Sequence, residues 1–207
     1  MSDADLAALV AGIAACRVCR DQPAGGPERR LPHEPRPVAV LSGKARILIA
    51  GQAPGIRVHE SGIPFNDPSG DRLRAWLGVD REQFYDPDRF AIVPMGFCFP
   101  GYDAKGSDLP PRRECAPLWR TRVIASMPQV ELVLAIGSYA QKWHLGPNSG
   151  LMTETVRTWR SYSQGSGGPD VLPLPHPSWR NSGWLKRNTW FEAELLPELK
   201  TKVLSLI

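Results

Sequence analysis

The sequence predicts a single-domain α/β protein with a central four-stranded, mainly parallel sheet flanked by helices. Four short apolar runs lack the polar alternation of half-exposed strands, so they are typical of strands buried on both faces. Helical patterns separate these runs, and strands that alternate with helices pair in parallel beneath helices on both sides. The 207 residues suit one domain with a full hydrophobic core. No linker divides the chain, so residues 1–207 are predicted to form one domain.

The N-terminal part of the chain contains one predicted strand between two predicted helices. Ser2 or Asp3 suits the N-cap of the first helix, and Gly78 suits the end of the second. Between the first helix and the strand, the chain is rich in Pro, Gly and Arg, which indicates an extended surface loop. The expected elements are a helix over 3–14, the loop over 21–44, a strand over 45–50 and a helix over 69–78.

The rest of the chain supplies three further strands. Pro94 lies inside the second apolar run and would confine or distort that strand, because proline has no N–H to donate to a sheet. Pro197 interrupts the closing helix for a similar reason. The expected elements are strands over 90–97, 130–136 and 171–174, and helices over 114–126, 139–145, 153–159 and 185–206.

Three loops follow the first, second and fourth predicted strands, over residues 51–67, 98–113 and 175–188. In an open parallel sheet, ligands bind beyond the carboxyl ends of the strands. Clusters of Gly and Pro, together with Cys98, His59 and His176, lie in these loops. We therefore predict that the three loops meet and form the functional site.

Composition and charge leave several classes of partner open. Apolar residues make up 42% of the chain, and the net charge is +4. Basic clusters such as Arg29-Arg30 and Arg112-Arg113 could contact phosphates, or they could belong to an ordinary solvated surface. No apolar run approaches the length of a membrane span, and the acidic N-terminus lacks the basic region of a signal peptide. A cytoplasmic protein is expected.

The chain has four cysteines, Cys16, Cys19, Cys98 and Cys115. An intracellular protein seldom uses cysteines for disulfides. Cys16 and Cys19 form a C-x2-C pair that can bind one metal, whereas the other two are too far apart in sequence to form a second such pair. One close pair with two separated thiolates favours an iron–sulfur cluster, which needs four cysteines. Zinc and unliganded buried thiols stay open as alternatives.

Six motifs resemble those of the uracil-DNA glycosylase superfamily, most closely its iron–sulfur (family 4-like) branch, in order and at similar spacing. The motifs are Cys16-x-x-Cys19, Gly51-Gln52-Ala53-Pro54-Gly55, Gly62-Ile63-Pro64-Phe65, Cys98, Cys115 and His176-Pro177-Ser178. Each motif alone is weak, but together they cover nearly the whole chain in register. The resemblance implies a uracil-DNA glycosylase-like α/β/α sandwich. It also implies a structural 4Fe–4S cluster on the four cysteines, with zinc as the less favoured occupant.

By this resemblance the protein is a monofunctional uracil-DNA glycosylase of base excision repair. It would flip uracil out of single- or double-stranded DNA and hydrolyse the N-glycosidic bond, leaving an abasic site. The resemblance implies that Phe65 stacks on the extruded ring and that His176 donates to uracil O2 as the base departs. Gln52 belongs to a Gly/Pro turn whose backbone N–H groups could bind the base carbonyls. A monomer associated with the nucleoid is expected.

The same resemblance places further residues around the base and the DNA. The other substrate-binding candidates are Gly51, Ala53, Gly55, His59 and Asn181, and the DNA-binding candidates are Ser178, Trp179, Arg180 and Lys186. Ser178, Arg180 and Lys186 suit contacts with phosphates. Trp179 or Arg180 could fill the space that the flipped base vacates, although Trp179 equally suits packing against a helix.

The motifs depart from the family pattern in the residues that would position water. Gln52 stands where the iron–sulfur branch usually has Glu, and Ala53 stands where other branches have a water-positioning Asp. Asp67 is the favoured replacement and is predicted to be catalytic with His176 and Gln52, although Asp67 also suits a turn before Pro68. The other acids nearby in sequence are Glu60, Asp71, Asp103 and Asp108.

Two further departures concern the base itself. The strand-two Asn that reads the uracil edge is missing from the region of Pro94, and Gly55 stands where a Tyr excludes thymine in other branches. These departures leave two alternatives open. One is a glycosylase for another deaminated base, such as hypoxanthine or xanthine. The other is a non-catalytic DNA-binding iron–sulfur protein on the same scaffold.

Overall fold

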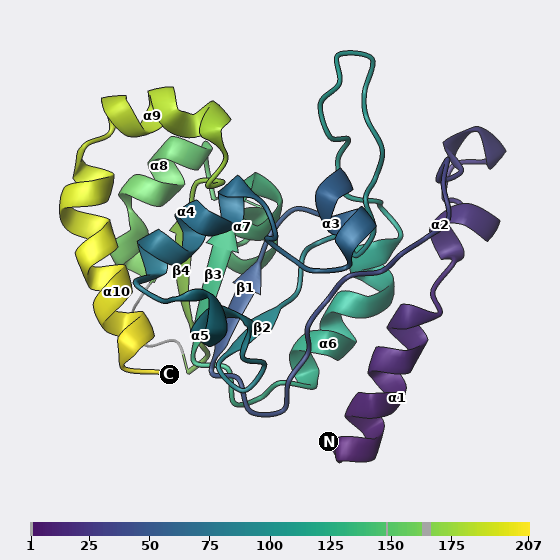
Figure 1. Cartoon of the computed structure of the whole chain (residues 1–207), viewed down its shortest axis with the longest axis horizontal. Coiled ribbons are helices and arrows are strands. Elements are labelled where there is room, and N and C mark those ends of the chain that lie inside the picture. The colour runs from purple at the N-terminus through teal and green to yellow at the C-terminus, as the bar shows by residue number, and fades with distance from the viewer. Residues whose placement is uncertain (1, 148, 163–166) are drawn as a thin grey trace.

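A computed structural model describes residues 2–147, 149–162 and 167–207. Its centre is a four-stranded sheet in the order β2-β1-β3-β4, and every neighbouring pair is parallel (Figure 1). The strands are β1 (Ile47–Ala50), β2 (Phe90–Ile92), β3 (Leu132–Ile136) and β4 (Asp170–Leu174). The expectation of a four-stranded parallel sheet flanked by helices is confirmed.

Helices cover both faces of the sheet. Side chains alternate along each strand, so both faces carry apolar residues that must be buried. Ile47 and Ile49 belong to one core cluster, and Leu48 and Ala50 belong to the other. The first cluster includes side chains from α4 (Pro68–Leu77), α8 (Met152–Arg157), α9 (Ser182–Arg187) and α10 (Leu196–Leu204). The second includes side chains from α1 (Asp3–Ala14), α6 (Thr121–Ala125) and α7 (Gly137–Leu145). In Figure 1 these two helical layers lie on opposite sides of the strands.

Several predicted boundaries change in the structure. The second strand ends at Ile92, two residues before Pro94, as the missing proline N–H leads one to expect. The predicted helix over 114–126 is wrong as a single α-helix, because a π-helical segment, Ala116–Arg120, precedes α6. The closing helix is also divided, since α9 ends at Arg187 and a π-helical segment, Phe191–Leu195, leads into α10.

Three short helices, α2 (Val18–Asp21), α3 (Ile56–Ser61) and α5 (Arg81–Tyr85), were not among the expected elements. Three 3-10 segments complete the helical structure of the described residues, Pro27–Arg29, Trp159–Tyr162 and Trp179–Asn181. Helices of four to six residues carry too little periodic pattern to be recognised from sequence. No helix in the described part of the chain combines the length and apolarity that a membrane crossing requires.

The segment over 21–44 is extended, as expected, but it does not lie wholly on the surface. Leu31 and Val38 are buried in it. Val40 forms an antiparallel bridge with Ile92, and the Val38 N–H donates to the Phe97 carbonyl over 2.7 Å. Part of the segment therefore runs along β2 and the chain that follows it.

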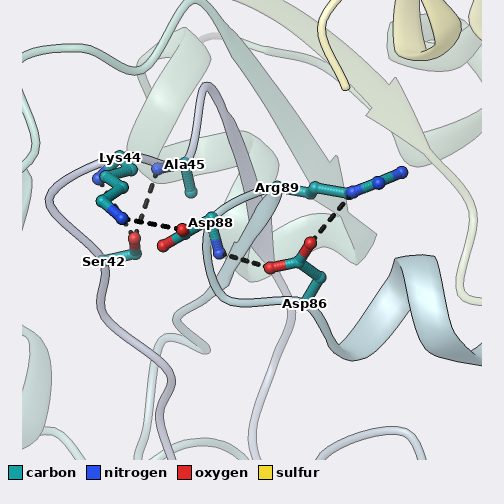
Figure 2. A network of polar contacts seen from close by, with 6 residues as sticks. All are labelled: Ser42, Lys44, Ala45, Asp86, Asp88 and Arg89. Carbon is teal, nitrogen blue, oxygen red and sulfur yellow. Dashed lines mark hydrogen bonds and ion pairs between the residues drawn. The ribbon is translucent and has the colours of Figure 1, made fainter.

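The amino ends of β1 and β2 are joined by a network of polar contacts (Figure 2). The Ser42 hydroxyl accepts the backbone N–H groups of Lys44 and Ala45, and Lys44 Nζ donates to Asp88 over 2.9 Å. Asp86 accepts the Asp88 N–H and Arg89 Nε, at 2.9 and 3.0 Å. These contacts fix the loops that enter the two strands.

Candidate active site

A cavity of about 320 Å³ lies at the carboxyl ends of the strands. Its wall includes residues from each of the three loops that the sequence predicted to meet. Phe65 comes from the loop after β1, Asp108 from the loop after β2, and His176 from the loop after β4. Ile92 and Pro94 contribute from the end of β2. The sheet order thus brings Phe65 and His176 into the wall of one cavity.

Phe65 has the backbone conformation least expected of an aromatic residue. Its φ angle is +53°, in the left-handed region that bulky side chains rarely adopt. The half-buried ring lies edge-on to the Phe84 ring, with 6.1 Å between the ring centroids. A side chain at Gly51 would begin 3.8 Å from the tip of the Phe65 ring. The ring therefore sits close to the end of β1 while the cavity borders it.

His176 is held by two hydrogen bonds that determine which ring nitrogen can act. Its Nδ1 accepts the Ser178 N–H over 3.2 Å, so the neutral ring carries its proton on Nε2. Asn181 donates its side-chain amide to the His176 carbonyl over 2.7 Å. Burial lowers the pKa of His176, and the nearby Asp67 carboxylate opposes this shift. The ring is thus prepared to act as a neutral hydrogen-bond donor.

Asp67 combines a structural role with a place in the cavity wall. Its Oδ1 accepts the Gly70 N–H over 2.9 Å and so caps the amino end of α4. The same carboxylate lines the cavity and acts electrostatically on His176. The interpretation of Asp67 as a turn residue is therefore correct, and the cap also fixes the carboxylate at the cavity.

Asp108 is a second carboxylate in the cavity wall. A Cβ at Gly55 would lie 3.6 Å from its Oδ2, so Gly55 leaves room for this side chain. Burial raises the pKa of Asp108, and the charge of Arg180 opposes the shift. Asp108 belongs to a hairpin-like loop closed by a bridge between Tyr102 and Asp108, which rises beside α3 as a long teal loop in Figure 1.

Gln52 ties two of the three loops together. Its Nε2 donates to the Leu109 carbonyl over 3.3 Å, and its own carbonyl accepts the Gly96 N–H over 3.0 Å. Gln52, Ala53 and Gly51 all line the cavity. The amide of Gln52 is therefore engaged in holding the loop that carries Asp108.

The chain just after β2, which includes the cavity residue Pro94, is held by a buried arginine. Arg120 is 1% exposed, and its Nη1 donates to the Val93 and Pro94 carbonyls, each over 3.1 Å. Its Nη2 lies 2.6 Å from His144 Nε2. Burial lowers the pKa of Arg120 to about 10, which still leaves the guanidinium charged at neutral pH. In the region that lacks the expected Asn, the Val93 and Pro94 carbonyls are thus bound by a cation.

The segment after His176 presents exposed side chains beside the cavity. Ser178 accepts the Arg180 N–H with its hydroxyl over 3.1 Å, and its carbonyl accepts Arg72 Nη1 over 2.9 Å. Trp179 is 73% exposed, and the Arg180 guanidinium lies 5.6 Å from the centre of the Trp179 ring. All three residues line the cavity. Trp179 is therefore not packed in the core.

The four cysteines line a second, much smaller cavity. The first pair comes from the segment around α2, and Cys98 and Cys115 flank the loop after β2. Burial raises the pKa of Cys98 and of Cys115 to about 12, and it also raises the pKa of Cys19. Among the described residues, no three His, Cys, Asp or Glu side chains are grouped as a single metal ion requires.

Among the described residues, hydrogen bonds reach the sulfur atoms of Cys115 and Cys16. The Phe97 N–H donates to Cys115 Sγ and Trp119 Nε1 donates to Cys16 Sγ, both over 3.3 Å. The Arg36 backbone lowers the pKa of Cys98 and Arg112 lowers the pKa of Cys19, each against the larger effect of burial. Such donors stabilise thiolates and tune the metal groups that thiolates bind.

A comparison with protein families identifies the group to which the chain belongs. The family model described as the uracil DNA glycosylase superfamily matches residues 39–200. The chain belongs to this superfamily. The matched range contains every residue of the larger cavity except Val38, but it begins after Cys16 and Cys19. A solution NMR structure from Methanosarcina acetivorans, described as a candidate uracil DNA glycosylase, has 16% identity and a TM-score of 0.46, with 78% of this chain and 95% of that chain covered.

In this superfamily member, three predicted site residues lie outside the cavity wall. His59 on α3 instead contacts His33, with 4.6 Å between the ring centroids, and burial lowers its pKa. Asn181 supports the main chain of His176. Lys186 lines a separate surface groove with Arg72. The structure thus gives His59 and Asn181 other neighbours, and the roles predicted for these three residues in binding base or DNA stay predictions.

Sequence reasoning did not single out Asp108 or Arg57, which both line the cavity. Asp108 was one of several nearby acids, and sequence distance could not rank them. Among the described residues, the cavity wall does not include the other three acids, Glu60, Asp71 and Asp103. Arg57 lies on α3, a helix that the sequence did not predict, so no sequence pattern indicated that its side chain would line the cavity.

Proposed function

We propose that the protein is a monofunctional DNA glycosylase that flips uracil out of DNA and hydrolyses its N-glycosidic bond. The observation that supports this most directly is that Phe65 and His176 line one cavity. A volume of about 320 Å³ is within the usual range of small-molecule sites, about 300–1,000 Å³. The base would therefore be processed away from the DNA stack, inside the protein.

The exposed rim of the cavity suits the DNA around a flipped base. Trp179 and Arg180 project beside the cavity, where a large aromatic side chain can replace the stacking of the extruded base. Arg57 and Arg180 carry positive charge at the rim, which suits backbone phosphates. Phe65 offers its ring to the base, and aromatic stacking tolerates different base identities.

His176 would stabilise the leaving base. Cleavage places negative charge on the departing uracil, and a fixed donor aimed at that charge lowers the barrier. Because Nδ1 accepts the Ser178 N–H, the Nε2–H is the donor that remains for uracil O2. The lowered pKa keeps the ring neutral at pH 7, so the donor acts as imidazole and not as imidazolium.

Asp67 is the favoured carboxylate for positioning the attacking water. Its orientation is fixed by the cap on α4, and its charge would also favour the positive sugar that forms as the bond breaks. Asp108 is the competing candidate in the same wall. Asp67→Asn and Asp108→Asn separate the two, because the asparagine that replaces the water-positioning carboxylate should abolish most of the turnover.

A wider base range is the second candidate function. Ile92 and Pro94 form the β2 side of the cavity, where no amide reads the base edge, and Gln52 Nε2 is already bound to the Leu109 carbonyl. Such a wall discriminates weakly among bases that differ in their hydrogen-bonding edge. Hypoxanthine and xanthine are the alternatives that this observation favours.

The four cysteines would hold a structural 4Fe–4S cluster. Each thiolate of such a cluster binds a different iron, so the sulfurs need not surround one ion as they do at zinc. The shared cavity and the N–H donors at Cys16 and Cys115 fit this group. When bound, the cluster would connect α2 to the loop after β2, and it takes no part in bond cleavage. Iron and acid-labile sulfide analysis of the purified protein tests this, and stoichiometric zinc without iron would contradict it.

The test of function uses oligonucleotides that contain one uracil, hypoxanthine or xanthine, as single strands and as duplexes, followed by alkali. Scission at uracil alone supports the proposal, and scission at several lesions supports the wider base range. Tight binding without scission at any of these bases would leave only the non-catalytic alternative. His176→Ala is the control for contaminating glycosylases, since any scission that survives it in full is not due to this site.

A further inference from the structure

We propose that helices α4 and α5 clamp Phe65 in its left-handed conformation, so that its ring is a preformed plate for the base. Gly70, Arg74 and Tyr85 are the positioning residues of this clamp. The inference rests on the proposed function, because a fixed Phe65 ring serves a purpose when a base stacks on it. Gly70, Arg74 and Tyr85 do not line the cavity themselves. It concerns how Phe65 is held, which the resemblance to the superfamily leaves open.

The conformation of Phe65 requires an external cause. A φ of +53° is strained for a bulky side chain, and such strain persists only where the surroundings over-determine it. Among the described residues, Phe65 is the one residue other than glycine with a positive φ. Strained residues of this kind gather at functional sites, and this one borders the proposed base cavity.

Gly70 provides the first part of the clamp. A Cβ at this position would lie 1.8 Å from the Phe65 carbonyl oxygen and 2.7 Å from its carbonyl carbon. Real Cβ atoms do not approach backbone that closely, so only glycine allows the Phe65 main chain to rest on the first turn of α4. The Gly70 N–H is meanwhile bound to Asp67, which fixes the other end of the same short loop.

Side chains from α4 and α5 hold the carbonyls on either side of the Phe65 Cα. Arg74 Nη1 donates to the Phe65 carbonyl over 3.4 Å, and the Tyr85 hydroxyl donates to the Pro64 carbonyl over 2.9 Å. Arg81 Nη2 donates to Asn66 Oδ1 over 3.0 Å. Each of the residues from Pro64 to Asp67 is therefore bound by a contact with α4 or α5.

The burial of Arg74 is the strongest sign that this arrangement serves a purpose. Its side chain is 8% exposed, and a buried charge is costly unless it is well paired. Its ion-pair partner is the exposed Asp71, 2.6 Å away. Its guanidinium lies 5.3 Å from the centre of the Phe84 ring and 5.7 Å from that of Tyr85. An apolar residue would fill this place more simply, but it could not donate to the Phe65 carbonyl.

The clamp also controls the ring of Phe65. Phe84, from the same helix as Tyr85, packs its ring edge-on against the Phe65 ring. The backbone and the ring are thus fixed from one side, while the cavity borders the other. A plate that is already oriented loses little conformational freedom when a base stacks on it, so affinity for the flipped base rises.

A double-mutant cycle tests this inference. Tyr85→Phe and Arg74→Met are made in the wild type and in Phe65→Ala, and kcat/KM for uracil release is measured below the unfolding temperature of every variant. In the wild type, Tyr85→Phe should reduce kcat/KM by about 3- to 10-fold and Arg74→Met by about 10-fold or more, as expected for losing neutral and charged hydrogen bonds. In the Phe65→Ala background both losses should shrink to about twofold or less, because the plate is gone.

Matched controls remove the same groups elsewhere. Tyr139→Phe deletes a hydroxyl on the half-exposed face of α7, and Arg46→Met deletes an arginine paired with Glu131 before β1. Both should keep wild-type kcat/KM. Full additivity of the Tyr85 and Phe65 losses, or of the Arg74 and Phe65 losses, would show that the residues act independently and would overturn the clamp.

Fluorine NMR of protein labelled with fluorophenylalanine reads the clamp without any substrate. The chain has six phenylalanines, and Phe65→Leu assigns the Phe65 signal. A single sharp signal in the wild type that shifts or broadens in Tyr85→Phe and Arg74→Met supports the inference, and an unchanged signal in both overturns it. This readout separates the two proposals, because an inactive wild type refutes the glycosylase function while the spectrum still decides the clamp.

Discussion

The side chains at the two ends of the sheet are held in different ways. At the amino ends of β1 and β2, Lys44, Asp86, Asp88 and Arg89 bind one another and the nearby backbone (Figure 2). At the carboxyl ends, His176 accepts the Ser178 N–H with Nδ1, and Phe65 is held in a strained left-handed conformation. Contacts at the amino ends fix the loops, whereas those at the carboxyl ends hold two side chains of the cavity wall. The carboxyl ends are also where ligands bind in open parallel sheets.

The largest effect that this comparison predicts comes from His176. His176→Ala removes the donor proposed for the leaving base, so kcat should fall by about 10²- to 10³-fold. The melting temperature should change little, because in the described part of the chain the ring's hydrogen bond is the one that it accepts from the Ser178 N–H. Single-turnover excision and thermal unfolding measure the two quantities. A variant that keeps wild-type kcat would remove His176 from the mechanism.

The next effect concerns Phe65. Phe65→Ala should lower kcat/KM by about 10- to 100-fold, since stacking on an aromatic ring is worth about 1–3 kcal/mol per base. Phe65→Tyr keeps the plate and should retain most of the activity. Steady-state kinetics on the uracil oligonucleotide distinguishes them. Equal activity in the alanine and tyrosine variants would mean that the ring only packs in the core.

The protonation of His176 provides a finer test at the carboxyl end. Burial lowers its pKa, so an NMR titration should place its midpoint below 6.5 and show a neutral ring at pH 7. Asp67→Asn should lower this midpoint further, because the carboxylate stabilises the protonated ring. The same substitution at Asp88, at the amino end of the sheet, serves as the control. A midpoint above 6.5 in the wild type would contradict the neutral donor.

The smallest effect is expected at the amino end. Asp88→Ala removes the ion pair with Lys44. The Asp88 side chain is 53% exposed and the Lys44 side chain is 74% exposed. Exposed pairs are worth about 0.2–1 kcal/mol, so denaturant unfolding should show a loss in that range. Uracil excision should be unchanged, since the network lies at the opposite end of the strands from the cavity. A large loss of activity in this variant would show that the two ends are coupled.

Much of the fold could be predicted because buried parallel strands carry a local apolar pattern. The positions of all four strands and of the helices α1, α4 and α7 follow from such patterns. The predicted convergence of three loops also follows, since it depends only on parallel pairing. The boundaries that failed, at residues 114–126 and 185–206, lie where π-helical segments divide a continuous helical pattern. No apolar periodicity distinguishes a π-helical turn from the α-helix that it interrupts.

The sequence by itself determined the parallel sheet, the loops that carry its chemistry, and the presence of Phe65 and His176 in those loops. Only the tertiary structure decided that Asp108 enters the cavity while His59 turns toward His33, and that Arg74 and Tyr85 reach back to hold the loop of Phe65. Apolar periodicity reports which face of an element is buried. The direction of one polar side chain depends on neighbours far away in sequence, and these become known only when the strands are placed in the order β2-β1-β3-β4.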